Sequence, residues 1–177
     1  MDLLKERSVE GLTLLEVGGG IGAIQIELLK AGLARAVSVE LTPSYEESAT
    51  ELLREAGLLE RVERKVMDFV DAAAEVAAAD IVVMNRVVCC YPDLPRLESA
   101  AADHARQLLV MSFPKERWWS RVVVWMANVG MAMTRREFRI FLHPVAQIAA
   151  IGESHGLKRS ITRTGVFWEI AMMHRAA

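Results

Sequence analysis

Residues 14–29, LLEVGGGIGAIQIELL, join an apolar run to four glycines and then to an apolar stretch with helical spacing. The apolar run, 12–17, predicts a buried strand, and the stretch after the glycines, 21–32, predicts a helix. Glycines let the backbone approach a ligand closely, and the strand-to-helix turns of an open parallel sheet lie where ligands bind. The stretch therefore predicts an α/β fold with a ligand site after its first strand.

Short β-branched runs and amphipathic stretches alternate through the next part of the chain. Strands are predicted at 36–41, 62–68, 80–85 and 107–113, and helices at 44–57, 70–79 and 93–105. Thr42 or Ser44 is placed to cap the first of these helices, and Gly32 and Gly57 are placed to end helices in a left-handed turn. This alternation predicts parallel strands with helices on both faces of the sheet.

The pattern changes after residue 113. A long helix-like stretch, 116–134, is followed by a helix at 144–156, and then by two strands, 157–164 and 166–175, that are separated only by a turn at Gly165. So short a connection permits an antiparallel hairpin and excludes a parallel crossover. The predicted fold is a doubly wound, Rossmann-like α/β sheet that is mostly parallel and ends in an antiparallel hairpin. Because no linker or repeat interrupts it, we expect one domain over residues 1–177.

The composition excludes several classes of protein. Of the 177 residues, 53% are apolar and 25% charged, as in soluble globular proteins, and the net charge of −2 does not favour nucleic acid as a partner. Cys89 and Cys90 are adjacent, so they form neither a disulfide framework nor a metal site, and we expect a cytoplasmic protein without a metal. No signal peptide is evident. The apolar stretch 118–134 contains Arg121 and Asn128 and is too short to span a bilayer.

Two classes of ligand fit the glycine-rich turn. Gly18, Gly20 and Ala23 match a dinucleotide fingerprint, and Glu40, 22 positions after Gly18, matches its ribose-binding acid. Glu16 argues against a dinucleotide because a carboxylate beside the turn would repel a pyrophosphate. A cationic ligand without phosphate, such as S-adenosylmethionine, suits it better. In the alternative interpretation, Glu16 only accepts hydrogen bonds from the amides of the loop.

Acidic and polar residues recur at the ends of the predicted strands. Glu16, Gly18, Gly20 and Gly22 form an acid-x-Gly-x-Gly-x-Gly element, Glu40 ends the second strand, Asp68 ends the third, and Asn85 and Arg86 end the fourth. In these motifs the chain resembles the class I S-adenosylmethionine-dependent methyltransferases over nearly its whole length. The resemblance implies that the glycine-rich element holds the cofactor, and that the strand-end residues contact its other parts.

The resemblance also assigns a role to each strand end. Glu40 would bind the ribose hydroxyls and Asp68 the adenine amino group, while Asn85 and Arg86 would line the methionine end. Phe69 would offer the adenine a ring contact, and Val66 and Met67 would add apolar contacts. Ordinary structural roles remain open: an exposed strand-end acid for Glu40, a helix cap for Asp68 and turn residues for Asn85 and Arg86.

The acceptor side carries fewer signals, because methyl transfer depends mostly on alignment and needs a base only where the acceptor must lose a proton. Tyr91 and His143 are the candidate catalytic residues, ahead of Asp93 and Cys90. A packed turn tyrosine and a capping histidine are their structural alternatives. The other histidines are expected at the surface, and the two cysteines are expected to be small apolar residues.

Three stretches give a narrower resemblance, to the magnesium-protoporphyrin O-methyltransferases. They are NRVVCCYPD at 85–93, SFPKERWW at 112–119 and RIFLHP at 139–144. The resemblance implies that the acceptor is a carboxylate of a large planar molecule, with His143 near it and, more loosely, Tyr91.

The tryptophans of the long helix-like stretch fit the same resemblance. Trp118, Trp119 and Trp125 would form a flat wall for a planar substrate, or else the core of a lid or a homodimer face within 115–134. Only about ten residues precede the first strand, where such enzymes have closing helices. The chain is therefore a fragment or minimal member, or 115–143 acts as a lid on the substrate side.

We therefore expect a methyltransferase that acts on a small molecule, at a carboxylate or hydroxyl oxygen of a large planar substrate. An NAD(P)-binding Rossmann protein and a non-enzymatic cofactor-binding relative are the alternatives.

Overall fold

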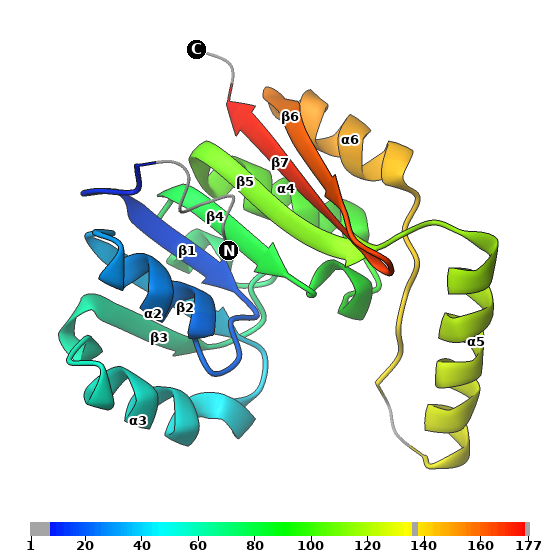
Figure 1. The fold of residues 1–177 in the computed structure, drawn as a ribbon, viewed down its shortest axis with the longest axis horizontal. Helices are drawn as coiled ribbons and strands as arrows, with labels where there is room; N and C mark the ends of the chain where they lie inside the picture. Colours follow the sequence, from blue (N-terminus) through cyan, green and yellow to red (C-terminus); the bar gives the residue numbers. More distant parts are fainter. Residues whose placement is uncertain (1–7, 136–137, 176–177) are drawn as a thin grey trace.

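The computed structural model describes residues 8–135 and 138–175, and these form one seven-stranded sheet in the order β3-β2-β1-β4-β5-β7-β6 (Figure 1). The strands are β1 Thr13–Val17, β2 Arg35–Glu40, β3 Val62–Val66, β4 Ala79–Asn85, β5 Ala105–Pro114, β6 Leu157–Thr164 and β7 Trp168–Arg175. The first five strands are parallel, while β7 pairs antiparallel with both β5 and β6. This confirms the predicted fold class.

The order of the strands reverses at β1, which lies between β2 and β4. In a doubly wound sheet the ligand crevice lies outside the carboxyl ends of the strands at this switch point. The glycine-rich loop 18–22 leaves β1 at that point. The topology therefore places the decisive stretch of sequence where a ligand is expected.

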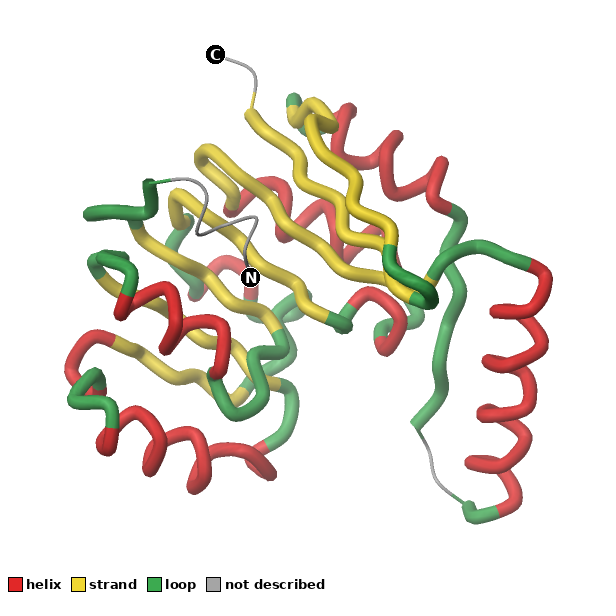
Figure 2. The backbone as a smooth tube through the Cα atoms, viewed as in Figure 1, coloured by secondary structure: helices red, strands yellow, loops and turns green. Residues whose placement is uncertain are grey.

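Helices cover both faces of the sheet (Figures 1 and 2). α2 Ala23–Lys30 and α3 Glu46–Glu55 lie on one face, while α4 Leu94–His104 and α6 Val145–Ser154 lie on the other. α2 and α3 are each followed by a glycine with positive φ, at Gly32 and Gly57, as predicted. Thr42 caps a 3-10 turn that leads into α3 rather than α3 itself.

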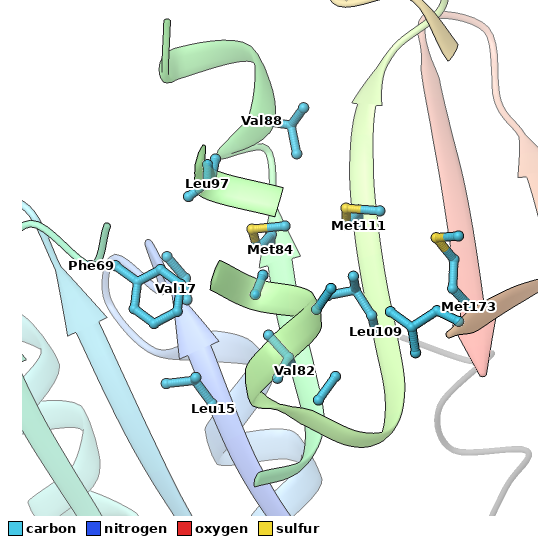
Figure 3. Packing of buried hydrophobic residues seen from close by; sticks show 14 of the residues in the cluster. Leu15, Val17, Phe69, Val82, Met84, Val88, Leu97, Leu109, Met111 and Met173 are labelled. Atoms are coloured by element: carbon cyan, nitrogen blue, oxygen red, sulfur yellow. The ribbon is translucent and has the colours of Figure 1, made fainter. Parts of the chain in front are cut away.

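The buried side chains form two clusters, one on each face of the sheet. Figure 3 shows part of the larger cluster, in which Leu15 and Val17 of β1 share a face with Met84 and Leu109. Leu14 packs in the other cluster, with Leu28 and Leu29 of α2 and with residues of β4 and β5. Because both faces are covered, the central strands read as nearly continuous apolar runs rather than as alternating ones.

The predicted helix at 70–79 is wrong: the structure has only a 3-10 turn there, Ala73–Glu75. Nε2 of His104 lies 3.0 Å from the carbonyl oxygen of Ala73 and 3.1 Å from that of Val76. A ten-residue alanine-rich segment is too short to be helical by itself, so this tertiary contact decides its conformation.

His104 itself was expected at the surface and instead packs against the ring of Phe69, with 5.3 Å between ring centroids. Its ring therefore joins α4 to the segment that follows β3.

A carboxyl group is buried without a partner on α4. Glu98 is fully buried beside Gly152 of α6, and neither of its carboxyl oxygens has a hydrogen-bond partner within the described ranges. Burial raises the pKa of Glu98 from 4.5 to about 8. The folded protein therefore holds a proton on Glu98 at pH values where the unfolded chain has lost it.

Stability is expected to fall as the pH rises from about 5 to about 8, because over that range the folded state binds more protons than the unfolded state. Glu98→Gln removes one of two buried acids whose pKa is raised to about 8, the other being Glu16, so it should reduce this fall by about half and raise the Tm at pH 8. Thermal unfolding between pH 5 and pH 9 measures both effects, with the exposed Glu47→Gln on α3 as the matched control. An unchanged pH slope in Glu98→Gln would contradict the assignment.

Candidate functional site

The glycine-rich loop is shaped by three residues with positive φ: Gly18 at +67°, Gly20 at +56° and Gly22 at +83°. The amide of Gly18 donates to the carbonyl of Val39 on β2 at 2.8 Å, which holds the loop against the neighbouring strand. A Cβ atom at Gly18 would lie 2.4 Å from Cγ2 of Val87, whereas a Cβ atom at Gly20 would meet nothing within 4 Å. Gly18 therefore allows the loop to approach Val87 closely inside the protein. Gly20 presents bare backbone to open space.

Glu40, at the end of β2, binds this loop directly. Its Oε2 accepts a hydrogen bond from the Gly20 amide at 2.8 Å, and its Oε1 accepts one from the Leu41 amide at 3.1 Å. Hydrogen bonds to a carboxylate are about twice as strong as neutral ones. Glu40 thus fixes the position of the bare backbone at Gly20 and places its own oxygens at the same edge of the sheet.

Glu16 does not lie where its charge could meet a ligand. Its side chain is 2% exposed and lies under the loop, where a Cβ atom on Gly19 would be 2.9 Å from its carboxyl carbon. Burial raises the pKa of Glu16 to about 8, although a hydrogen bond from the Gln25 backbone and the charge of Arg64 oppose the shift. The predicted repulsion between the Glu16 carboxylate and a pyrophosphate therefore does not apply to this geometry. The alternative, an acid that supports the loop from behind, fits better.

Arg64 of β3 is a site residue that the sequence did not reveal. Its guanidinium donates to the carbonyl of Gly20 at 3.1 Å and pairs with Glu46 of α3 at 2.6 Å. Arg64 therefore ties the loop to α3. Nothing in the local sequence VERKV distinguishes Arg64 from the lysine beside it, so only the fold identifies this role.

Asp68 and Tyr91 are brought together from separate parts of the chain. The Tyr91 hydroxyl lies 3.3 Å and 3.2 Å from the two carboxyl oxygens of Asp68, to which it donates, and the Val70 amide donates to Asp68 Oδ1 at 2.8 Å. Burial and the negative charge of Asp68 both raise the pKa of Tyr91. The hydroxyl therefore keeps its proton at neutral pH and orients Asp68, a role that sequence reasoning assigned to no residue.

The ring of Phe69 does not reach the site. Its side chain is 4% exposed and lies in the core beside Val17 (Figure 3), with His104 against its edge. The predicted ring contact between Phe69 and an adenine is therefore wrong. Apolar surface at this edge comes from other exposed side chains, which are Ile21, Leu41, Tyr45 and Val66. Of these four residues, only Val66 was predicted to contact the adenine. Leu41 could also have been found, because an apolar residue directly after a strand-end acid is a usable signal for such a contact.

Asn85 and Arg86 stand exposed at the end of β4, held by Ser112 of β5. The Ser112 hydroxyl donates to Asn85 Oδ1 at 2.7 Å and accepts from the Arg86 amide at 2.9 Å. Arg86 has a φ of 61°, unusual for a residue other than glycine, and its guanidinium carbon lies 4.9 Å from the Trp168 ring centroid. Strained backbone of this kind persists where the surroundings fix it, and it is common at functional sites.

His143 lies on the segment that returns from the long helix after β5. Its Nε2 is 3.0 Å from the Tyr91 carbonyl oxygen, and its ring stacks on Phe141. Because a carbonyl only accepts, Nε2 carries the proton in this contact, and Nδ1 of the neutral ring is left as an acceptor. Tyr91 and His143, the two predicted catalytic residues, are therefore neighbours. Of the two, only His143 has an acceptor nitrogen that could take a proton.

The less favoured candidates have structural roles. Asp93 caps α4, with its Oδ1 accepting from the Arg96 amide at 3.1 Å. The sulfur atoms of Cys89 and Cys90 lie 3.6 Å apart, and both contact the Arg86 carbonyl oxygen. Burial and the neighbouring thiol raise the pKa of Cys89, so it remains a thiol.

Residues 8–135 and 138–175 contain no group of three or more His, Cys, Asp or Glu residues that could hold a metal ion. No helix in that part of the chain has both the length and the apolar character needed to cross a bilayer.

The structure has a glycine-rich loop at the switch point, closed by a carboxylate from the next strand. Its sheet has β7 inserted between β5 and β6. Together these features define the fold class of the Rossmann-like methyltransferases. The family model described as methyltransferase domain matches residues 15–108, which is more than half of the chain. The chain therefore belongs to this family of S-adenosylmethionine-dependent methyltransferases, and the predicted resemblance is confirmed.

Solved structures share the fold. Magnesium protoporphyrin IX methyltransferase from Synechocystis PCC 6803, with bound SAH, matches 98% of this chain and 78% of its own, with a TM-score of 0.79 and 20% identity. An O-methyltransferase family protein from Burkholderia thailandensis matches 99% of this chain and 55% of its own, with a TM-score of 0.81 and 20% identity. Mitomycin 7-O-methyltransferase matches 96% of this chain and 50% of its own, with a TM-score of 0.71 and 23% identity.

A comparison with curated proteins finds no match. The structural likenesses are all below 25% identity, so they support the fold and leave the acceptor open.

Proposed function

We propose that this protein transfers the methyl group of S-adenosylmethionine to an oxygen atom of a large planar small molecule, either a carboxylate or a hydroxyl. The observation that carries the proposal is the hydrogen bond between Glu40 and the Gly20 amide at the switch point of the sheet. It holds the loop, at a glycine with open space where a Cβ atom would lie, beside the acid that suits a ribose diol. The choice of acceptor follows magnesium protoporphyrin IX methyltransferase, whose fold this chain shares at 20% identity.

The residues at this edge fit the cofactor. Gly20 offers bare backbone with open space beside it, and the oxygens of Glu40 and Asp68 are acceptors at the ends of neighbouring strands. The backbone of Gly18, Gly20 and Gly22 would hold the cofactor. Glu40 would bind its ribose and Asp68 its adenine. Asn85 and Arg86 would line its methionine end. When bound, the cofactor would supply a methyl group on a sulfonium sulfur: a nucleophilic oxygen would bond to the methyl carbon as its bond to sulfur breaks, and S-adenosylhomocysteine would leave as a neutral thioether. Glu16 acts from beneath the loop and keeps its shape.

The acceptor decides whether a base is needed. A carboxylate is already ionised at neutral pH, so alignment suffices. For a hydroxyl acceptor, we assign proton removal to Nδ1 of His143, whose Nε2 is held by the Tyr91 carbonyl. Tyr91 is then a positioning residue that acts through Asp68. The segment 115–143 is proposed to lie on the substrate side as an insertion after β5.

Calorimetric titration with S-adenosylhomocysteine tests the cofactor assignment, with NADH as the competing ligand. The comparison matters because the buried position of Glu16 removes the electrostatic objection to a pyrophosphate. We expect binding of S-adenosylhomocysteine and none of NADH. Binding of NADH alone would overturn the proposal.

Variants at the acceptor side test the roles of Tyr91 and His143. Tyr91→Phe should weaken S-adenosylhomocysteine binding about fivefold, because Asp68 loses a hydrogen bond that orients it, an indirect effect of about 1 kcal/mol. His143→Ala should leave that affinity unchanged and lower kcat with hydroxyl acceptors about 100-fold, but not with carboxylate acceptors. Equal loss with both acceptor types would contradict a role in proton removal.

A further inference from the structure

The most prominent exposed feature is the segment that follows β5. We call residues 115–143 the arm: α5, Trp118–Met133, leads away from the end of β5, and residues 138–143 return towards the sheet. Figures 1 and 2 show α5 standing apart from both helical layers, with the return segment between it and the rest of the molecule. The arm therefore has an inner face towards the protein and an outer face away from it.

The inner face of α5 contacts the rest of the protein. Ser120 and Val124 are buried, and the Asn128 side chain bonds both the amide and the carbonyl of Ile140, each at 2.9 Å. The return segment is in turn fixed to the protein by a hydrogen bond of 2.7 Å from the Phe141 amide to the Cys89 carbonyl. These contacts set the rotation of α5 about its own axis.

The outer face of α5 is apolar and exposed. It is made of Trp118, Val122, Trp125, Met126, Val129 and Met133, with exposed fractions between 40% and 81%. At about 100° per residue, these six side chains fall within about 100° of the helix circumference, opposite Ser120 and Val124. A contiguous apolar patch of this kind marks an interaction surface. Two of the tryptophans considered for a wall against a planar substrate, Trp118 and Trp125, belong to this exposed face.

The charge of the arm identifies what the outer face fits. Residues 115–143 contain six basic and two acidic residues, a net charge of +4, while the whole chain carries −2. Arg117, Arg121, Arg135 and Arg139 are all exposed. A twofold pairing of two copies through this face would bring equal positive charges together, which opposes the homodimer face that the sequence left as one alternative. An anionic surface is attracted by the same charges.

We propose that the arm docks on anionic lipid membranes, with the outer face of α5 in the headgroup region and its arginines at the lipid phosphates. Tryptophan and arginine are the side chains that favour this interface, and basic residues near an anionic surface strengthen binding. The attachment is peripheral, since α5 lies along the surface of the membrane and does not cross it. It would hold the carboxyl edge of the sheet close to apolar molecules dissolved in the bilayer.

Co-sedimentation with vesicles of phosphatidylcholine, with and without 30% phosphatidylglycerol, tests this proposal on the whole chain. We expect the protein to bind the anionic vesicles and to bind the neutral ones at least tenfold more weakly. Trp125→Ser with Met126→Ser and Met133→Ser should lower binding to anionic vesicles at least tenfold without changing the Tm, because these side chains are exposed. Arg135→Gln with Arg139→Gln should also lower it about tenfold.

The matched control is Leu59→Ser, which removes an exposed apolar side chain far from the arm and should bind as the original chain does. Two results would overturn the proposal. One is a protein that stays in the supernatant with anionic vesicles. The other is a dimer, measured by light scattering without lipid, that the three-residue variant converts to a monomer, since a second copy would then cover the outer face.

Discussion

Glu40→Ala is expected to lower the affinity for S-adenosylhomocysteine by about 100-fold or more. The variant removes the acceptor of the Gly20 and Leu41 amides, at 2.8 Å and 3.1 Å, together with the proposed ribose contact. A hydrogen bond to a charged group contributes about 1.5 to 3 kcal/mol, so losing two such bonds to the ribose hydroxyls would account for a drop of this size. Calorimetric titration measures the affinity directly.

The matched control for this variant is Glu47→Ala, an exposed acid on α3, which should bind S-adenosylhomocysteine as the original chain does. Circular dichroism of both variants separates lost binding from lost folding. If Glu40→Ala retained an affinity within threefold of the original, Glu40 would be an ordinary strand-end acid and the cofactor site would lie elsewhere.

Gly18→Ala is expected to lower the free energy of unfolding by about 2 to 5 kcal/mol, more than the same change at Gly57. The two glycines have nearly equal φ angles, +67° and +68°, so the cost of left-handed backbone, about 1 to 2 kcal/mol, is shared. Only at Gly18 does the new Cβ atom meet Val87, at 2.4 Å, while at Gly57 it meets nothing within 4 Å. Overpacking adds about 1 to 3 kcal/mol. Urea unfolding of the two variants compares them.

Val87→Ala provides the second part of this experiment. In the double variant the clash is relieved, so Gly18→Ala should cost no more in the Val87→Ala background than Gly57→Ala costs in the original chain. Equal losses at Gly18 and Gly57 in the original background would show that the loop moves away from Val87 without cost.

The fold was largely predictable because its signals are local. Apolar runs, strand-end acids and the short turn at Gly165 each depend on residues close in sequence, and together they predict seven strands and the antiparallel hairpin. The segment 70–79 was not predictable from its alanines, since its conformation depends on His104, about 30 residues away.

The site was predictable in its parts but not in its contacts. Glu40 lies where the sequence suggested, yet nothing local pairs Asp68 with Tyr91, 23 residues further on. Glu16 shows a missed inference, because a residue within a strand covered on both faces has no open side for its charge to face. Similarly, the periodicity of α5 reveals two faces but not which one turns outward, since that depends on the contact between Asn128 and Ile140.

The place of β7 in the sheet has a consequence for the order of assembly during synthesis. β6 is made before β7, yet its neighbour in the sheet is β7, which separates it from β5. A nascent chain that has reached only residue 164 therefore has no partner for β6, and its β5 edge exposes unpaired amides and carbonyls. The sheet closes on this side only after residues 168–175 leave the ribosome, so the interval before that is when the chain is most prone to mispairing.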